Sequence, residues 1–300
     1  MSLFDRLVVW TLPAVPRFIV GKVASRYVSG ETLADAVETI RRLNGEGAMA
    51  TVDLLGEEVT EREKATTALA EYHRIFDAIR EHGLDCNVSV KLTQLGLEID
   101  EEFCRDNADR LVRQAVEHGR FVRLDMEDRH STDATLRIYR HLHQRHGGHV
   151  GVVFQSYMRR TLRDIGELPA EDANVRLCKG IYIEPRHTAW KGYETVRLNF
   201  IAALEKLFRQ GVYVGVATHD EHLVCAAVAM IDKLAIPRER YEFQMLLGVD
   251  AELRRILIDG GHRLRVYVPY GRDWYQYSTR RLRENPKVAG HVMRAMLKGE

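Results

Sequence analysis

The sequence predicts an α/β fold in which eight strand-helix units close into a (β/α)8 barrel. Three observations support this fold class: strand-like and helix-like segments alternate regularly, the strand-like segments number eight, and one extra helix-like segment precedes the first of them. Five of the helix-like segments end near a glycine, as helices commonly do, at Gly83, Gly119, Gly147, Gly211 and Gly260. A doubly wound open sheet is the competing architecture.

Short runs of apolar and β-branched residues bounded by turn residues predict the strands. They cover residues 48–54, 87–92, 121–126, 149–155, 175–179, 212–217, 241–246 and 264–268. Longer segments without internal glycine or proline predict the helices. They cover residues 31–43, 60–82, 101–118, 133–145, 158–165, 195–209, 221–234, 251–259 and 273–283. Pro269 and Gly271 predict a turn directly after the last strand.

Residues 1–30 are predicted to form an N-terminal helical arm, followed by a catalytic barrel over residues 31–300. The arm is apolar, but Asp5, Arg6, Arg17 and two prolines interrupt it. No apolar run approaches the ~20 residues that span a bilayer, and no signal-peptide pattern is recognisable. We expect the arm to pack against the barrel, with membrane-surface contact or homo-oligomer formation as the alternatives.

The charge balance and the cysteines exclude several classes of protein. The chain has 44 basic and 43 acidic residues and a formal net charge of +1, so we expect no nucleic-acid partner and only local recognition of anions. The four cysteines are scattered without a CxxC pair, which argues against a zinc cluster and fits a reducing, cytoplasmic environment. We expect them to be ordinary buried thiols.

Polar side chains recur where the predicted strands end, and in a barrel the chemistry lies at these carboxyl ends. A single lysine or histidine in such a place is usually solvated or caps a helix. Convergence on one rim instead predicts a polar cavity, because burying many charges costs free energy unless they pair or bind a ligand. The residues are Asp53, Lys91, Asp125, Glu127, Asp128, Gln155, Tyr157, Arg176, Lys179, Tyr182, Glu184, Thr218, His219, Asp220, Gln244, Leu246 and Tyr267.

A pair of arginines follows the last predicted strand. Tyr277, Arg281 and Glu284 can share one face of the predicted helix, with Arg280 beside them. Adjacent guanidinium groups repel each other unless they are solvated or an anion lies between them, and their planar donors suit a carboxylate or a phosphate. A solvated helix face is the ordinary interpretation, but the preceding strand, turn and aromatic residues favour a ligand-binding loop.

The motifs leave three kinds of chemistry open. No GxGxxG, P-loop, HExxH or GxSxG motif is present, so we expect no metal site, no common dinucleotide or triphosphate loop and no serine nucleophile. Lys91 or Lys179 could form a Schiff base in an aldolase. The same groups would suit a flat anionic cofactor with a small carboxylate substrate, or a barrel that binds an amino acid without catalysis.

Seven separated motifs resemble those of the proline dehydrogenase family of flavoenzymes. They are SVKLTQLG, RLDMED, QSYMRR, RLCKGIYIEP, VATHDE, EFQMLLG and VYVPYGRDWYQYSTRRLREN, in this order along residues 89–285. The chain resembles the compact, monofunctional bacterial type. The resemblance implies a distorted (β/α)8 TIM barrel that binds FAD and oxidises L-proline to Δ1-pyrroline-5-carboxylate, the first step of proline catabolism. It also implies hydride transfer to flavin N5 and electron transfer to a quinone acceptor, with peripheral membrane contact.

The resemblance further implies roles for individual residues. The substrate carboxylate would be held by Lys91, Arg280 and Arg281, and Asp125 and Glu284 would hold these cations in place. Leu246, Tyr267 and Tyr277 would surround the pyrrolidine ring. The cofactor would be bound by Arg176 near flavin N5 and by Gln155, Lys179, Tyr182, Thr218, His219 and Gln244 along the rest of the molecule.

Overall fold

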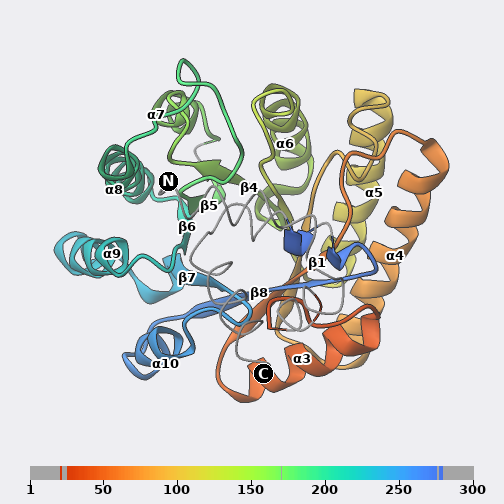
Figure 1. Cartoon of the computed structure of the whole chain (residues 1–300), viewed down its shortest axis with the longest axis horizontal. Helices are drawn as coiled ribbons and strands as arrows, with labels where there is room; N and C mark the ends of the chain where they lie inside the picture. Colours follow the sequence, from red (N-terminus) through yellow and green to blue (C-terminus); the bar gives the residue numbers. More distant parts are fainter. Residues whose placement is uncertain (1–20, 22–25, 170, 276, 280–300) are drawn as a thin grey trace, which may run out of the picture.

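In a computed structural model of the chain, which describes residues 21, 26–169, 171–275 and 277–279, eight parallel strands form a closed barrel. Each strand pairs with its neighbours in chain order, and β8 returns to pair with β1, where Thr51 lies opposite Tyr267. The helices follow one another around the outside of this sheet (Figure 1). The (β/α)8 barrel is therefore confirmed, and the open-sheet alternative is wrong.

The strands and helices lie close to the predicted segments. The strands are β1 (Met49–Leu54), β2 (Cys86–Val90), β3 (Val122–Leu124), β4 (Val150–Gln155), β5 (Asn174–Cys178), β6 (Tyr213–Ala217), β7 (Tyr241–Leu246) and β8 (Leu264–Tyr270). The helices are α3 (Leu33–Gly45), α4 (Arg62–Glu81), α5 (Glu101–Glu117), α6 (Thr132–His146), α7 (Thr161–Gly166), α8 (Tyr193–Arg209), α9 (Glu221–Leu234) and α10 (Ala251–Asp259). Two short 3-10 helices, η2 (Gly147–His149) and η3 (Arg238–Arg240), precede β4 and β7.

The turn predicted at Pro269 begins later than expected. Strand β8 continues through Pro269, which pairs with Asp53, and ends at Tyr270. Proline is tolerated near the end of this strand because only its carbonyl is needed there, to accept a hydrogen bond from Ser29 N–H at 2.9 Å. The predicted turn is therefore shifted to Gly271, whose φ of +134° suits glycine.

Local capping explains why α3 begins at Leu33 and not at residue 31. The Thr32 hydroxyl accepts a hydrogen bond from Asp35 N–H at 3.3 Å, and the Asp35 carboxylate accepts one from Thr32 N–H at 2.9 Å. This capping box satisfies two of the backbone donors that a helix start leaves without a partner. Helix α3, which packs against β1 and β8, therefore begins at a defined residue, Leu33.

The strands divide the interior into an apolar layer and a polar one. Alternate residues such as Val52, Val88 and Val266 are buried in one large hydrophobic cluster with side chains of the surrounding helices. The intervening residues face into the barrel and are mostly polar. The buried ones include Thr51, Asp53, Asn87, Ser89, Lys91, Arg123, Asp125, Gln155, Arg176, Glu242, Gln244 and Arg265. The main hydrophobic core therefore lies between sheet and helices, and the barrel interior is hydrogen-bonded.

Much of the predicted arm and of the last predicted helix lies outside the described residues. Of residues 1–30, the description covers Gly21 and residues 26–30, where Val28 packs against Leu55 and Tyr277. Of residues 273–283, the described residues 274, 275 and 277–279 are helical, as predicted. The domain boundary at residue 30 stays a prediction. Within the described ranges, no helix combines the length and the apolar character needed to cross a membrane.

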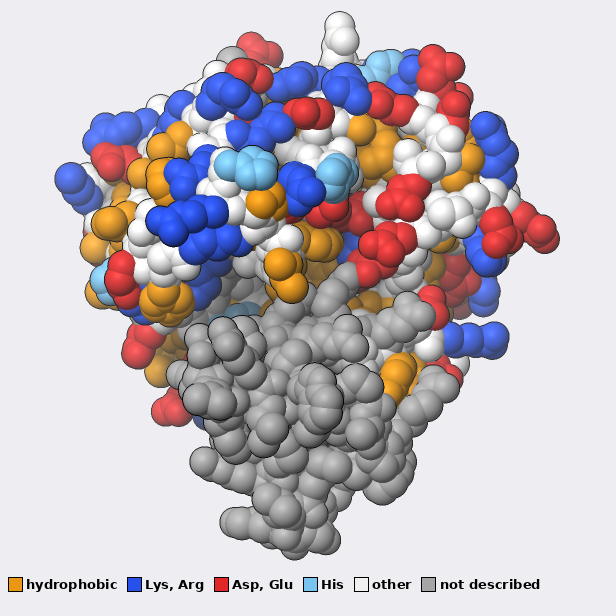
Figure 2. All heavy atoms as spheres, turned by 45° about the horizontal axis from the view of Figure 1, so that its top comes forward, with side chains coloured by type: hydrophobic (Ala, Val, Ile, Leu, Met, Phe, Trp, Pro, Cys, Tyr) orange, Lys and Arg blue, Asp and Glu red, His pale blue; other side chains and the backbone are white. Residues whose placement is uncertain are grey.

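The near-zero net charge agrees with the molecular surface. On the face shown in Figure 2, basic and acidic side chains are interspersed over the described part of the surface.

The burial of the cysteines agrees in part with the expectation. Cys86 and Cys104 are buried as expected. The expectation is wrong for Cys225, which is exposed on α9, and Cys178 is only partly buried because it lines a cavity.

A substitution of Gly151 tests how tightly the barrel interior is packed. A Cβ atom at this position would lie closer than 3 Å to Asn174 O, Arg123 Nη1 and Phe121 Cζ. We expect Gly151→Ala to lower the free energy of unfolding by about 1–3 kcal/mol, measured by urea unfolding, because overpacking displaces neighbours. Gly45→Ala is the control, since a Cβ there would meet no atom within 4 Å. Equal stability of the two variants would contradict the tight packing.

Candidate active site

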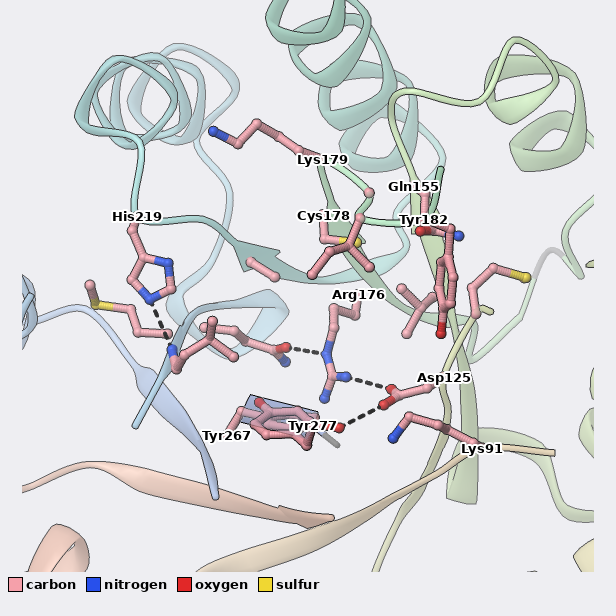
Figure 3. A pocket seen from close by; sticks show the side chains of 18 residues that line it. Lys91, Asp125, Gln155, Arg176, Cys178, Lys179, Tyr182, His219, Tyr267 and Tyr277 are labelled. Atoms are coloured by element: carbon pink, nitrogen blue, oxygen red, sulfur yellow. Dashed lines mark hydrogen bonds and ion pairs between the residues drawn. The ribbon is translucent and has the colours of Figure 1, made fainter. Parts of the chain in front are cut away.

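A cavity of about 290 Å³ opens at the carboxyl ends of the strands (Figure 3). Seven strands or the residues directly after them supply its walls, which places it where barrel enzymes carry their chemistry. Charged, aromatic and aliphatic side chains share the lining. The lining residues are Lys91, Asp125, Met126, Val153, Gln155, Arg176, Cys178, Lys179, Gly180, Ile181, Tyr182, Ala217, His219, Gln244, Met245, Leu246, Tyr267 and Tyr277.

Lys91 enters the pocket from the end of β2 and forms a buried ion pair with Asp53. Its Nζ lies 3.1 Å from Oδ2 and 3.3 Å from Oδ1 of Asp53. Burial alone would lower the pKa of Lys91, but the carboxylates of Asp53, Asp125 and Glu127 outweigh burial and raise it. A lysine held as an ammonium ion is a poor nucleophile, so this pair argues against a Schiff base on Lys91.

Arg176 lies at the centre of the pocket and is held from two sides (Figure 3). Its Nη1 donates to Asp125 Oδ1 at 2.6 Å and to Ser89 Oγ at 3.2 Å, and its Nε donates to Gln244 Oε1 at 2.6 Å. Nη2 is buried and finds no hydrogen-bond acceptor among the described residues. A buried guanidinium nitrogen without an acceptor is costly, so a bound molecule with an acceptor atom would fit at this point.

Asp125 also connects Arg176 to the aromatic wall. Its Oδ2 accepts a hydrogen bond from the Tyr267 hydroxyl at 3.0 Å, and Arg176 Cζ lies 5.3 Å from the centre of the Tyr267 ring. Burial, followed by the nearby carboxylates of Asp125 and Asp53, raises the pKa of Tyr267 well above its usual value. Tyr267 is therefore a neutral donor whose ring is fixed in one orientation over the cavity.

Two further groups line the pocket near β6 and β7. His219 Nε2 accepts a hydrogen bond from Leu246 N–H at 2.9 Å, which leaves the ring proton on Nδ1 when the imidazole is neutral. The ammonium group of Lys179 points away from Arg176 (Figure 3) and lies 3.1 Å from Asp220 Oδ2. Asp220 also accepts hydrogen bonds from Tyr193 and Arg197, and these partners outweigh burial and lower its pKa.

The pocket brings together most of the residues singled out in the sequence. Those that line it are Lys91, Asp125, Gln155, Arg176, Lys179, Tyr182, His219, Gln244, Leu246, Tyr267 and Tyr277. Thr218 is buried beside the lining, where its hydroxyl accepts a hydrogen bond from Asp220 N–H at 3.0 Å. Arg280, Arg281 and Glu284 lie outside the described residues.

The structure adds partnerships that the sequence did not specify. Asp125 and Glu284 were expected to hold Lys91, Arg280 and Arg281 in place; among the described residues, Asp53 bonds Lys91 and Asp125 bonds Arg176. Ser89 and Glu242 were assigned no role, although Ser89 donates to Asp125 and Glu242 accepts from Gln244. Period-two alternation would have found both, since each lies two residues before a lining residue and so faces the barrel interior. Only closure of the barrel decides which of these side chains meet.

Glu127 lies behind the pocket at the end of β3. Its carboxylate accepts hydrogen bonds from Thr93 N–H at 3.1 Å and from the Thr93 hydroxyl at 2.6 Å, and its backbone carbonyl accepts from Gln155 Nε2 at 2.8 Å. Burial raises the pKa of Glu127 to about 7 in spite of these hydrogen bonds. No group of three or more His, Cys, Asp or Glu side chains within the described ranges is placed to hold a metal ion.

The closed barrel with a charged, aromatic pocket at its carboxyl end defines the chain as a (β/α)8-barrel protein with an enzyme-like site. The family model "Proline dehydrogenase" matches residues 36–294. The "Proline dehydrogenase" of Deinococcus radiodurans is 37% identical over 281 residues, covering 92% of this chain and 91% of that protein. "Proline dehydrogenase 1" of Bacillus subtilis strain 168 is 36% identical over 275 residues, with 92% and 91% covered. The chain belongs to the proline dehydrogenase family.

Solved structures show the same fold in a longer protein. Proline utilization A from Bdellovibrio bacteriovorus, crystallised after inactivation by N-propargylglycine, superposes with a TM-score of 0.80 at 24% identity. The match covers 87% of this chain and 32% of that one, so the chain spans about a third of its length. A mutant of proline utilization A from Bradyrhizobium japonicum superposes with a TM-score of 0.74 at 22% identity.

The raised pKa of Glu127 predicts a pH dependence of stability. A folded-state pKa near 7, above the unfolded value near 4.5, gives a contribution that is present below about pH 4.5 and lost as pH rises through 7. Glu127→Gln keeps a neutral side chain at every pH. We therefore expect the stability of the wild type relative to this variant to fall by roughly 3 kcal/mol between acidic and alkaline conditions. Urea unfolding at pH 5 and pH 8 measures this, and parallel pH profiles would contradict it.

Proposed function

We propose that this chain is an FAD-dependent L-proline dehydrogenase that oxidises L-proline to Δ1-pyrroline-5-carboxylate. Membership of the family and similarity over nine-tenths of two curated proline dehydrogenases support the substrate. The observation that carries the proposal is the pocket around Arg176, where a rigidly held guanidinium leaves the buried Nη2 without an acceptor among the described residues. Electrons would then pass to a quinone acceptor.

The residues of the pocket fit a flavin. Arg176 Nη2 offers a buried donor in need of an acceptor, and Gln155, Lys179 and His219 provide polar groups along the adjoining strand ends. The residues proposed to hold FAD are Gln155, Arg176, Lys179, Tyr182, Thr218, His219 and Gln244. When bound, FAD supplies the hydride acceptor, which side chains cannot provide. The protein's own contribution is then to orient the substrate and to exclude water.

We propose that proline is oriented through its carboxylate. Lys91, which stays an ammonium ion, would form the carboxylate clamp together with Arg280 and Arg281, and Glu284 would pair with these arginines. Tyr267, Tyr277 and Leu246 would pack around the ring. Charge-assisted bonds in a closed pocket are strong, and they would convert binding energy into a favourable reaction geometry. The substrate amine must lose its proton first, so activity should rise from neutral to alkaline pH.

The membrane and oligomer assignments belong to the same proposal. A quinone acceptor would lie in a lipid phase, and the apolar residues 1–30 provide a means of peripheral contact at the inner face of a membrane. The same apolar segment could instead form a homo-oligomer interface. Both assignments concern residues that are largely outside the described part of the chain.

The visible spectrum of the purified protein tests the proposed function directly. We expect a yellow protein whose flavin absorbance is bleached when L-proline is added without oxygen, because the flavin becomes reduced. A Schiff-base aldolase would be colourless and would be trapped on a lysine by borohydride. A barrel that only binds amino acids would bind proline without bleaching. A folded protein that contains no flavin and takes up none would refute the proposal.

Substitution of the two arginines tests the carboxylate clamp. We expect Arg280→Ala and Arg281→Ala each to raise KM for proline by about 10- to 100-fold, since a hydrogen bond to a charged group contributes about 1.5–3 kcal/mol. Flavin content should stay unchanged. Arg272→Ala is the matched control, because Arg272 is exposed and lies only two residues after the end of β8. Normal proline kinetics in both clamp variants would disprove this role.

A further inference from the structure

A line of hydrogen bonds runs from the pocket to the opposite end of the barrel. Arg176 Nε donates to Gln244 Oε1 at 2.6 Å, and Gln244 Nε2 donates to Glu242 Oε1 at 2.5 Å. Glu242 and Gln244 are two residues apart on β7, so both side chains face the barrel interior. All three residues are buried, and Glu242 is 1% exposed. Glu242 lies outside the pocket lining but is connected to it through one amide group.

The neighbours of Gln244 determine the orientation of its amide. Arg176 can only donate, so it needs the amide oxygen, and an ionised Glu242 can only accept, so it needs the amide NH₂ group. The amide therefore has one favourable orientation. If Glu242 did not accept this hydrogen bond, the amide could flip and turn its NH₂ group toward Arg176. Two donors would then face each other, and the hydrogen bond between Arg176 and Gln244 would be lost. Gly215 provides the space, since a Cβ atom there would lie within 3 Å of the amide.

Glu242 is itself held firmly as a carboxylate. Arg265 donates to it from Nε at 2.7 Å and from Nη2 at 3.0 Å, and the Tyr213 hydroxyl donates at 2.7 Å. Burial alone would raise the pKa of Glu242, but Arg265 and the hydrogen bonds outweigh burial and lower the pKa to about 2. Glu242 therefore accepts the hydrogen bond from Gln244 throughout the pH range in which the protein works.

We propose that Glu242 is a positioning residue for the reaction and that it acts through the Gln244 amide to fix the orientation of Arg176. The contacts on Nε and Nη1 together direct Nη2 at one place in the pocket. Without the Gln244 contact, the guanidinium keeps hydrogen bonds only through Nη1, to Asp125 and to Ser89. It can then rotate about this nitrogen. The inference rests on the proposed function, in which Arg176 lies beside the flavin.

The variants must separate this role from the stability of the barrel. Removing Glu242 alone would leave Arg265 buried without its counter-ion, which destabilises a protein strongly. The double variant Glu242→Met/Arg265→Met removes both charges together, a replacement that is often tolerated. Gly215→Ala displaces the Gln244 amide and leaves the Glu242–Arg265 pair intact. Tyr213→Phe is the control, because it removes a different hydrogen bond to Glu242 and leaves Gln244 in place.

The flavin-loaded proteins are compared by their steady-state kinetics and by the midpoint potential of the bound flavin. We expect the double variant and Gly215→Ala to lower kcat at least tenfold with KM for proline within twofold, because the carboxylate clamp is untouched. We also expect the midpoint potential of the bound flavin to become about 30 mV more negative in these variants. This shift corresponds to a tenfold weaker stabilisation of the reduced relative to the oxidised flavin. Tyr213→Phe should match the wild type in both quantities.

The outcomes distinguish this inference from the proposed function. Wild-type kcat and midpoint potential in a folded double variant and in Gly215→Ala would overturn the positioning role of Glu242. If the double variant does not fold, the result for Gly215→Ala decides alone. A wild-type protein that holds no flavin or does not oxidise proline would instead refute the proposed function.

Discussion

The buried ion pair between Arg176 and Asp125 is the interaction on which the arrangement of the pocket depends. Its Nη1–Oδ1 distance is 2.6 Å, and further hydrogen bonds of the two side chains reach Ser89 on β2, Gln244 on β7 and Tyr267 on β8. Five strands therefore meet through two charged side chains. A buried charge is costly unless it is paired, so each of these contacts constrains the others, and the pocket walls are held in one geometry.

The free energy that stabilises the fold comes from a different part of the molecule than the pocket. Barrel interiors are commonly filled by layers of branched apolar side chains, whereas this one is crossed by charged and amide groups. Burial of apolar side chains between the sheet and the helices supplies the stabilisation instead. Arg123 shows the cost of this arrangement: it bonds backbone carbonyls and Asn174, and burial, together with repulsion from Arg176, lowers its pKa to about 9.

The sequence was sufficient for the fold and for the position of the site, and insufficient for its contacts. All eight strands were found, and β7, α9 and α10 have the predicted bounds, because alternation and helical spacing are local patterns. Placing Lys91, Arg176 and Tyr267 on one rim followed from the carboxyl-end rule. The pairing of Lys91 with Asp53 did not follow, since these residues are 38 positions apart and meet only through the register of β1 and β2.

Local chemistry along the chain thus determined the order of the elements, the inward or outward direction of each strand residue and the family to which the motifs belong. Closure of the sheet decided the rest. It selected Asp125 as the partner of Arg176 and connected Glu242 to the pocket through Gln244. The physical reason is that a buried charge takes whichever counter-charge the three-dimensional register brings within hydrogen-bond distance, and sequence spacing does not encode that distance.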